Sequence, residues 1–154
     1  MKHRLAAGAL LVENDRLLLV HHVRPGAYDF WIPPGGGVMD DEELPVAAVR
    51  EVAEETGLVV EALNLAYIDE LLISDTRQCK FWFIARRLGG SLSGLPEAAR
   101  AEHIVEAAFL SRAEMVGKVV FPAVVVDEFW THLRDGFSQP KFLGVREAVI
   151  PFSA

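Results

Sequence analysis

Three carboxylates recur at helical spacing near the middle of the chain. Glu51, Glu54 and Glu55 stand at positions i, i+3 and i+4, so on a helix that turns about 100° per residue they share one face. The opposite side of the same segment is apolar or small, with Val46, Val49, Val52, Ala53 and Thr56. Like charges at this spacing repel one another, and only Arg50 interrupts the acidic face. The cluster is therefore either a solvated acidic surface or a site for a divalent cation.

A glycine-rich turn precedes these carboxylates. The prolines 33–34 lead into Gly35, Gly36 and Gly37, and glycine lets the backbone approach a ligand closely. Hard cations such as Mg²⁺ bind carboxylates, backbone carbonyls and substrate phosphates. The combination favours a metal site for a phosphate ester or anhydride over a plain acidic surface.

The same residues belong to a longer motif. Gly36, Glu42 and the run Arg50-Glu51-Val52-Ala53-Glu54-Glu55-Thr56-Gly57-Leu58 resemble the Nudix box, the signature of the MutT-like pyrophosphohydrolases, over residues 36–58. The resemblance also covers Trp31-Ile32-Pro33-Pro34-Gly35-Gly36 and extends more weakly over residues 3–135. It implies an α/β fold of the α+β type, a Nudix-like α/β/α sandwich with a mixed β-sheet.

The resemblance also implies roles for the carboxylates. It makes Glu51 and Glu55 the first metal ligands and Glu54 a further ligand or an acid/base residue, with the carbonyl of Gly35 as an additional ligand. The implied cofactor is Mg²⁺, with Mn²⁺ as the alternative. Such an ion lowers the pKa of a bound water and neutralises charge on phosphate oxygens.

Two further residues are implied to support this site. Arg50 would orient the helix carboxylates by pairing with them, and Glu42 would be its partner from the preceding loop. A general base in this family often lies on a loop outside the box. Glu102 is our first choice for it, followed by His103, and Glu54 remains a third candidate.

Cations and aromatic residues outside the box are candidates for binding the substrate. We expect Arg24 and Lys80 to contact phosphates and Trp31 to stack on a base. Other residues of the same types are Arg4, Arg77, Arg86, Phe30 and Phe81. The neighbours His21 and His22 would point to opposite faces of a strand and cannot easily share one metal ion, although one of them can face the substrate.

Apolar runs and turn residues predict the elements that position these groups. The predicted strands are 5–12 and 17–23, joined as a hairpin, and 58–65, 66–72, 78–88 and 104–110. A helix is predicted over 44–56, ended by Gly57, and a last helix from 121 to about 135, with a short helical turn after Ser111 between them. Residues 89–101 are expected to form a loop. The tail 137–154 would be a packed arm, an extra strand or a homodimer contact.

Composition limits the partners. The 154 residues, 51% of them apolar, are expected to form one domain over 1–154. Most of the net charge of −7 comes from residues 40–55, and no basic cluster offsets them. We therefore expect a small-molecule nucleotide substrate, no nucleic-acid polymer and no membrane. The apolar runs are too short to cross a bilayer, and the single cysteine, Cys79, favours a cytoplasmic location.

These observations converge on one function and leave two rivals. The expected activity is Mg²⁺-dependent hydrolysis of a diphosphate linkage in a nucleoside diphosphate joined to another moiety, or in a nucleoside triphosphate. The alternative is a catalytically inactive module that senses a nucleotide or ADP-ribose. An isomerase of isoprenoid diphosphates is a weaker rival, because that chemistry needs a well-placed cysteine and Cys79 lies in an aromatic strand.

Overall fold

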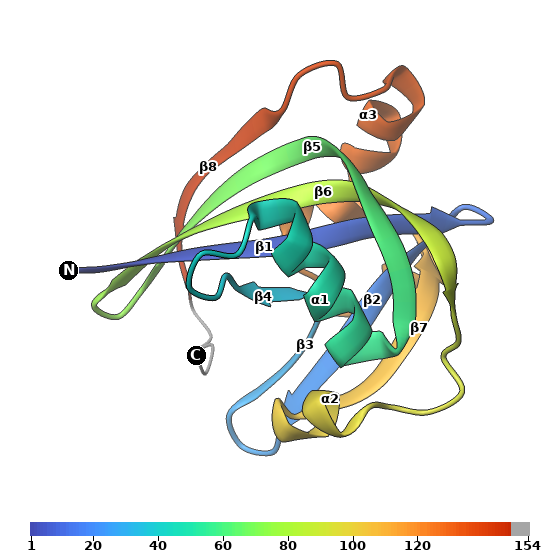
Figure 1. Cartoon of the computed structure of the whole chain (residues 1–154), viewed down its shortest axis with the longest axis horizontal. Coiled ribbons are helices and arrows are strands. Elements are labelled where there is room, and N and C mark those ends of the chain that lie inside the picture. Colours follow the sequence, from blue (N-terminus) through green and yellow to red (C-terminus); the bar gives the residue numbers. More distant parts are fainter. Residues whose placement is uncertain (149–154) are drawn as a thin grey trace.

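Strands dominate the architecture, shown in Figure 1 as a computed structural model that describes residues 1–148. Within that range the strands are β1 (Lys2–Glu13), β2 (Arg16–Arg24), β3 (Tyr28–Ile32), β4 (Gly35–Gly37), β5 (Leu58–Ile73), β6 (Thr76–Gly90), β7 (Ile104–Ser111) and β8 (Lys141–Glu147). The helices are α1 (Leu44–Thr56), α2 (Glu97–Ala101) and α3 (Phe129–Asp135), with one-turn 3₁₀ helices at Ala113–Met115 and Ala123–Val126.

The described strands form one mixed sheet in the order β3-β2-β1-β6-β5-β8, with β4 added to β1 and β7 added to β2. β1 pairs with β2 only beside their turn, at Val12 and Glu13, whereas it runs parallel to β6 from Lys2 to Leu11. The sheet therefore opens into two parts beyond the β1–β2 hairpin (Figure 1). This opening leaves room for a cavity between them.

Alternate residues of β1 pack against different parts of the core on the two faces of the sheet. Ala7, Ala9 and Leu11 pack on the side of α1, whereas Leu10 packs in the core on the other side. Successive strand residues point to opposite faces, and burial of both faces is typical of a sheet covered on both sides. Which residues of a strand can reach the site therefore depends on which face of the sheet they point to, and this face alternates from one residue to the next.

Helix α1 has local reasons to begin and end where it does. Pro45 fits the first turn, where no intrahelical N–H bond is lost. At the other end Gly57 adopts a left-handed φ of 83°, and its N–H donates to the carbonyl of Ala53 at 3.0 Å. Ala47, Ala48 and Val52 are fully buried, so small residues let the helix lie close to the sheet.

Much of the predicted order of elements is confirmed. The mixed sheet, the N-terminal hairpin and the strand over 104–110 are present, and α1 has the bounds predicted for it. The predicted short turn is present as the 3₁₀ helix Ala113–Met115, with Arg112 rather than Ser111 at its N-cap. Ser111 still accepts the N–H of Glu114 through its Oγ at 3.2 Å. The segments 58–65 and 66–72 form one continuous strand, β5, with bulges against β6.

Two predictions about local structure are wrong. The segment 89–101 is not loop throughout, because its last residues form the helix α2. The helix predicted over 121–135 is broken: residues Ala123–Val126 form a 3₁₀ turn, Asp127 leaves helical geometry at φ −136° and ψ −97°, and α3 begins at Phe129. The β-branched run Val124–Val126 disfavours a continuous α-helix.

Part of the tail forms a strand, which is one of the three predicted alternatives for it. Residues Lys141–Glu147 add to the sheet as β8, parallel to β5, so the extra strand is the correct interpretation for that part of the tail. Residues 149–154 lie outside the described range. Among the described residues, no helix has both the length and the hydropathy needed to span a membrane.

Candidate functional site

Arg50 organises the acidic residues around α1. Its guanidinium donates to both carboxylate oxygens of Glu42, at 2.8 and 2.9 Å, and to the carbonyl of Gly37 at 2.9 Å. It also donates to Glu51 at 3.0 Å and to Glu54 at 3.2 Å. The planar fork of arginine suits such bidentate pairing, and the bond to Arg50 lowers the pKa of Glu42 below its usual value.

A different trio of carboxylates converges on one point. Glu51 and Glu55 on α1 and Glu102 at the end of α2 each offer an oxygen, and these oxygens lie within 4.8 Å of one another. Glu51 and Glu55 are 5% and 2% exposed, and Oε2 of Glu51 is buried without a hydrogen-bond partner in the described part of the chain. Buried carboxylates are stable when paired or when they coordinate a metal. The donor set is all oxygen, which suits Mg²⁺.

The glycine turn fits tightly around these carboxylates. A Cβ on Gly36 would lie 2.6 Å from Cδ of Glu51, so only glycine leaves room for that carboxylate. The N–H of Gly35 donates to Oε1 of Glu55 at 2.7 Å. The turn thus fixes the carboxylate of Glu55 beside the other two carboxylates of the trio.

Burial and mutual repulsion perturb both helix carboxylates. Burial raises the pKa of Glu51, opposed by its bond to Arg50. Burial also raises the pKa of Glu55, and the neighbouring charges of Glu51 and Glu102 add to the effect. A cation bound among Glu51, Glu55 and Glu102 would offset the repulsion between their negative charges.

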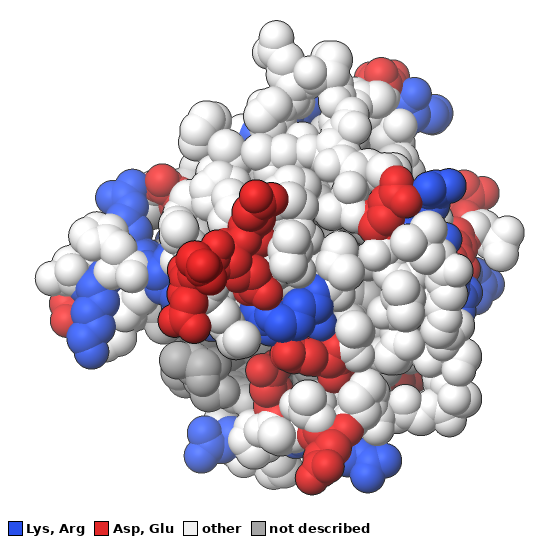
Figure 2. Space-filling model, viewed as in Figure 1, with Lys and Arg blue, Asp and Glu red and all other residues white. Residues whose placement is uncertain are grey.

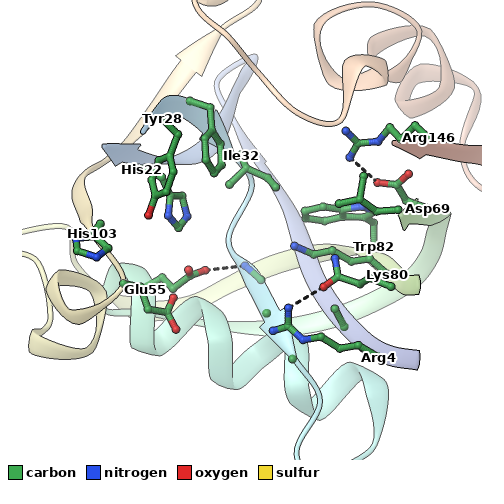
Figure 3. A pocket seen from close by; sticks show the side chains of 18 of the residues that line it. Arg4, His22, Tyr28, Ile32, Glu55, Asp69, Lys80, Trp82, His103 and Arg146 are labelled. Carbon is green, nitrogen blue, oxygen red and sulfur yellow. Dashed lines mark hydrogen bonds and ion pairs between the residues drawn. The ribbon is translucent and has the colours of Figure 1, made fainter. Parts of the chain in front are cut away.

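A cavity of about 270 Å³ opens beside the trio. Its floor is one face of the sheet, because alternate residues of three adjacent strands line it: Arg4 and Ala6 on β1, Gln78, Lys80 and Trp82 on β6, and Asp69 and Leu71 on β5. Figure 3 shows Glu55 toward one end and Asp69 with Arg146 toward the other, and Lys80 and Trp82 lie between them.

The opposite wall comes from the second part of the sheet. Tyr28, Phe30 and Ile32 line the cavity from β3 and His22 lines it from β2. His22 stacks on Phe30 with ring centroids 4.9 Å apart. Burial lowers the pKa of His22 to about 4, so its imidazole is neutral at physiological pH.

Lys80 places a buried cation between the two ends. It is 8% exposed, and its ammonium lies 4.2 Å from the centroid of the Trp82 ring. Burial lowers the pKa of Lys80, and the charges of Glu55 and Asp69 oppose that shift. The cavity therefore offers a carboxylate end, a central cation and aromatic surface.

The structure brings together some of the residues chosen from sequence. Gly35, Glu55, Glu102, His103 and Lys80 all line the cavity. Glu102, which we expected to be a general base only, joins the trio. Glu54, expected among the metal ligands, lies outside the trio, with its side chain 41% exposed and paired with Arg50.

Two residues chosen to bind substrate lie elsewhere. Arg24 ends β2 on the surface, and Trp31 points away from the cavity and stacks on His21 at a centroid distance of 4.2 Å. Trp31 follows Phe30 along β3, so the alternation that brings Phe30 into the cavity takes Trp31 out of it. The structure thus gives neither residue a place in the cavity.

Several lining residues escaped the sequence prediction: Tyr28, Ile32, Asp69, Leu71, Gln78, Trp82 and Arg146. The pattern Gln78-x-Lys80-x-Trp82 would have identified part of the floor once Lys80 was placed there. Asp69 is one of two neighbouring acids, with Glu70, in a mostly apolar strand, and Arg146 lies in a tail without clear periodicity. Neither carried a signal that distinguished it from an ordinary surface residue.

The charge distribution follows the same geometry. Acidic side chains gather on the face that carries α1 and the loop before it, with a basic group in their midst (Figure 2). Arg50, with its five donated hydrogen bonds, belongs to this region. The net charge is therefore concentrated at the candidate metal centre rather than spread over the molecule.

Comparison with known proteins adds a family match. The NUDIX domain family model matches residues 2–135. The chain is 30% identical to the 8-oxo-dGDP phosphatase NUDT18 of Danio rerio over 92 residues, which are 59% of this chain and 27% of that protein. It is also 30% identical to an RNA pyrophosphohydrolase of Novosphingobium aromaticivorans over 95 residues, 61% of this chain and 55% of that protein.

Solved structures agree on the fold. A NUDIX hydrolase from Nitrosomonas europaea superposes with a TM-score of 0.72 at 22% identity, covering 87% of this chain and 90% of that one. The match to the two curated relatives is shorter: the chain spans about a quarter of NUDT18 and just over half of the RNA pyrophosphohydrolase.

Proposed function

The chain belongs to the NUDIX domain family, and from this premise we propose that it is a Mg²⁺- or Mn²⁺-dependent hydrolase of diphosphate linkages. Its substrate would be a nucleoside diphosphate joined to another moiety, or a nucleoside triphosphate. The observation that carries the proposal is the trio of Glu51, Glu55 and Glu102, because Oε2 of Glu51 is buried with no partner among the described residues and the trio adjoins a cavity.

The three carboxylates, together with the carbonyl of Gly35, would hold the cation. When bound, Mg²⁺ supplies charge neutralisation on the phosphate oxygens and acidifies water. The buried Glu55 is held in place by the N–H of Gly35, and Glu51 is held by Arg50. Arg50 acts through these carboxylates and is a positioning residue.

The remaining lining groups would bind the substrate and accept a proton. Lys80 and Arg4 are cations on the floor of the cavity and would contact phosphate oxygens. Water would attack one phosphorus of the diphosphate linkage, and the bond from that phosphorus to the bridging oxygen would break. The bridging oxygen would leave with the other phosphate, and the proton of the water would pass to a carboxylate oxygen of Glu102. We favour Glu102 over Glu54 because Glu102 lines the cavity and Glu54 does not. His103, which also lines the cavity, is the remaining candidate.

The names of the relatives point to substrates that carry phosphate groups. One is named as a phosphatase of 8-oxo-dGDP and the other as a pyrophosphohydrolase of RNA. On the face that carries α1, acidic side chains surround the basic group at its centre (Figure 2). We propose a small nucleotide rather than a nucleic-acid polymer, acting in the cytoplasm, where a chain with the single cysteine Cys79 stays reduced.

The rival from another class is a sensor that binds a nucleotide without cleaving it. The structure gives no reason for a sensor to keep an unpartnered buried carboxylate oxygen on Glu51. A direct test assays nucleoside triphosphates and nucleoside diphosphate conjugates with Mg²⁺, and measures binding of the same compounds in parallel. Turnover by the wild-type protein supports the hydrolase, whereas binding without turnover of any compound would establish the sensor.

Two variants then separate the roles of the carboxylates. Glu102→Gln should reduce kcat by about 10²–10⁴-fold if it accepts the proton. Glu54→Gln should reduce kcat less, because Glu54 acts through Arg50. Full activity in Glu102→Gln together with a strong loss in Glu54→Gln would reverse the assignment.

A further inference from the structure

We infer that the pair of Asp69 and Arg146, at the end of the cavity away from Glu55, recognises the base of the nucleotide and favours guanine over adenine. The inference rests on the proposed function only in taking a nucleotide as the occupant of the cavity. It also gives strand β8 a task, since β8 supplies Arg146. The sequence assigned no function to this strand.

The pair is built into the cavity rather than onto the surface. The side chain of Asp69 is 5% exposed, and its Oδ2 accepts a hydrogen bond from Nη2 of Arg146 at 3.1 Å. The guanidinium of Arg146 lies over the ring of Phe121, 5.3 Å from its centroid. Both side chains line the cavity and point toward one another in Figure 3. The carboxylate is therefore held in one orientation.

An irregular register brings Arg146 to this face. Phe142 of β8 pairs with Ile68 of β5, but Val145 pairs with Glu70, so three steps along β8 match two along β5. The extra residue falls at Gly144, whose φ of 83° is left-handed. A bulge of this kind re-aims the side chains that follow it.

The bulge changes which residues of β8 point to the face of the sheet that lines the cavity. Arg146 pairs with Leu71, a residue of the cavity floor. A regular register would instead have paired Val145 with Leu71. The extra residue thus gives the cavity a cation in place of an apolar side chain.

The hydrogen-bonding groups at this end complement one edge of guanine. An ionised carboxylate only accepts hydrogen bonds, and guanine presents two adjacent donors, N1–H and the N2 amine, whereas adenine presents the acceptor N1 at the corresponding position. Arg146 binds one oxygen of Asp69, which leaves lone pairs on the carboxylate for those two donors. Adenine would set its N1 lone pair against the same carboxylate.

Donors on the adjoining strands suit the guanine carbonyl. Gln78 pairs with Leu71 across β5 and β6, and its Oε1 accepts a hydrogen bond from Nη1 of Arg4 at 2.8 Å. That bond fixes the amide so that its NH₂ group is the end free to donate. In addition, Nε of Arg146 is buried with no partner in the described part of the chain. An acceptor such as O6 of guanine would satisfy one of these donors.

The test compares guanine and adenine nucleotides in binding and in turnover. Equilibrium binding of dGMP and dAMP is measured by calorimetry, and kcat/KM is measured for dGTP and dATP with Mg²⁺. The wild type is expected to prefer guanine by about 10–100-fold. Asp69→Asn, whose amide can donate to N1 of adenine, should lower that ratio at least ~10-fold, mostly through weaker guanine binding.

Arg146 is tested as a positioning residue. Arg146→Ala should lower the guanine-to-adenine ratio, and Arg146→Lys should restore part of it. The matched control is Arg86→Ala, which breaks an ion pair that Glu61 of β5 makes with the neighbouring strand β6. That pair is exposed, and its loss should leave the ratio unchanged. If Arg146→Ala unfolds, Asp69→Asn and Arg146→Lys still decide the question.

The outcomes separate this inference from the proposed hydrolysis. Equal binding of dGMP and dAMP by the wild type, or an unchanged ratio in Asp69→Asn, would overturn the inference. An equal loss of both nucleotides in Arg146→Ala would show that this residue is only structural and would overturn its positioning role. Guanine preference without turnover would refute the hydrolase while supporting the base site, and turnover without base preference would do the reverse.

Discussion

The backbone of Gly36 lies against the carboxylate of Glu51 so closely that an added Cβ would stand 2.6 Å from Cδ and from Oε1. This contact explains the glycine in terms of packing, because Gly36 does not adopt a left-handed φ. The missing side chain of Gly36 thus leaves the space that the carboxylate of Glu51 occupies.

Substituting Gly36→Ala tests this relationship. The methyl group should displace Glu51 and lower activity with Mg²⁺ by about 10–100-fold, as do changes to residues that orient metal ligands. Gly89→Ala is the control, since a Cβ there meets no atom within 4 Å. Steady-state kinetics of the two variants provides the measurement. Equal activity in both would show that the position of Glu51 is unimportant.

Arg50→Lys tests the network that holds the carboxylates. Lysine keeps the charge but cannot form the paired bonds to the two oxygens of Glu42 while also reaching Glu51 and Gly37. We expect kcat to fall by about 10–100-fold, with a smaller change in KM. Arg86→Lys, at an exposed ion pair, should behave as wild type. A kcat loss of the same size in both variants would argue against a specific role.

Metal binding should be visible in stability without any substrate. A cation that binds only the folded state adds about 2.7 kcal/mol at a concentration of 100 times its Kd, so Mg²⁺ should raise the melting temperature of the wild type. Glu51→Gln and Glu55→Gln should lose this increase, whereas the exposed Glu61→Gln should keep it. Because burial raises the pKa of Glu51 and Glu55, neither Gln variant should be less stable than wild type without metal. An unchanged metal response in both would place the cation elsewhere.

The buried imidazole of His22 predicts a pH dependence of stability. Burial lowers its pKa from 6.5 to about 4, so between these values the unfolded chain binds the proton and the folded chain does not. The free energy of unfolding is unaffected by His22 protonation above pH 6.5. It declines as the pH falls from 6.5 toward 4, by up to about 3 kcal/mol. Denaturant unfolding at pH 7 and pH 5 should show a smaller loss in His22→Gln than in wild type. A loss of the same size would assign the effect to other groups.

The sequence predicts local structure best where period and end signals agree. Helix α1 has its predicted bounds because Pro45 and Gly57 mark both ends and the apolar residues keep a single period. Helix α2 has five residues and no side-chain cap, so nothing in the sequence distinguished it from loop. The last predicted helix failed at Val124–Val126, where β-branched residues carry apolar character without favouring a helix.

Some residues of the candidate site could be predicted from the sequence and others could not. The residues of the motif could be named from sequence because their spacing on one helix is itself the site. Trp31 and Phe30 could not be told apart, since which of them faces the cavity depends on the parity of β3. Asp69 and Arg146 meet only through the register of β8 on β5 and the bulge at Gly144, a pairing of residues far apart in the chain that no local pattern encodes.

Under the proposed function, Glu51, Glu55 and Glu102 hold a cation that supports cleavage of a nucleotide diphosphate linkage. The most direct measurement is the rate of product release from a nucleoside triphosphate as Mg²⁺ is titrated, for the wild type and for Glu55→Gln. We predict saturable, Mg²⁺-dependent turnover in the wild type and a loss of about 10²-fold or more in Glu55→Gln, with Glu61→Gln unaffected. Equal turnover by the wild type and Glu55→Gln across the Mg²⁺ range would contradict this account.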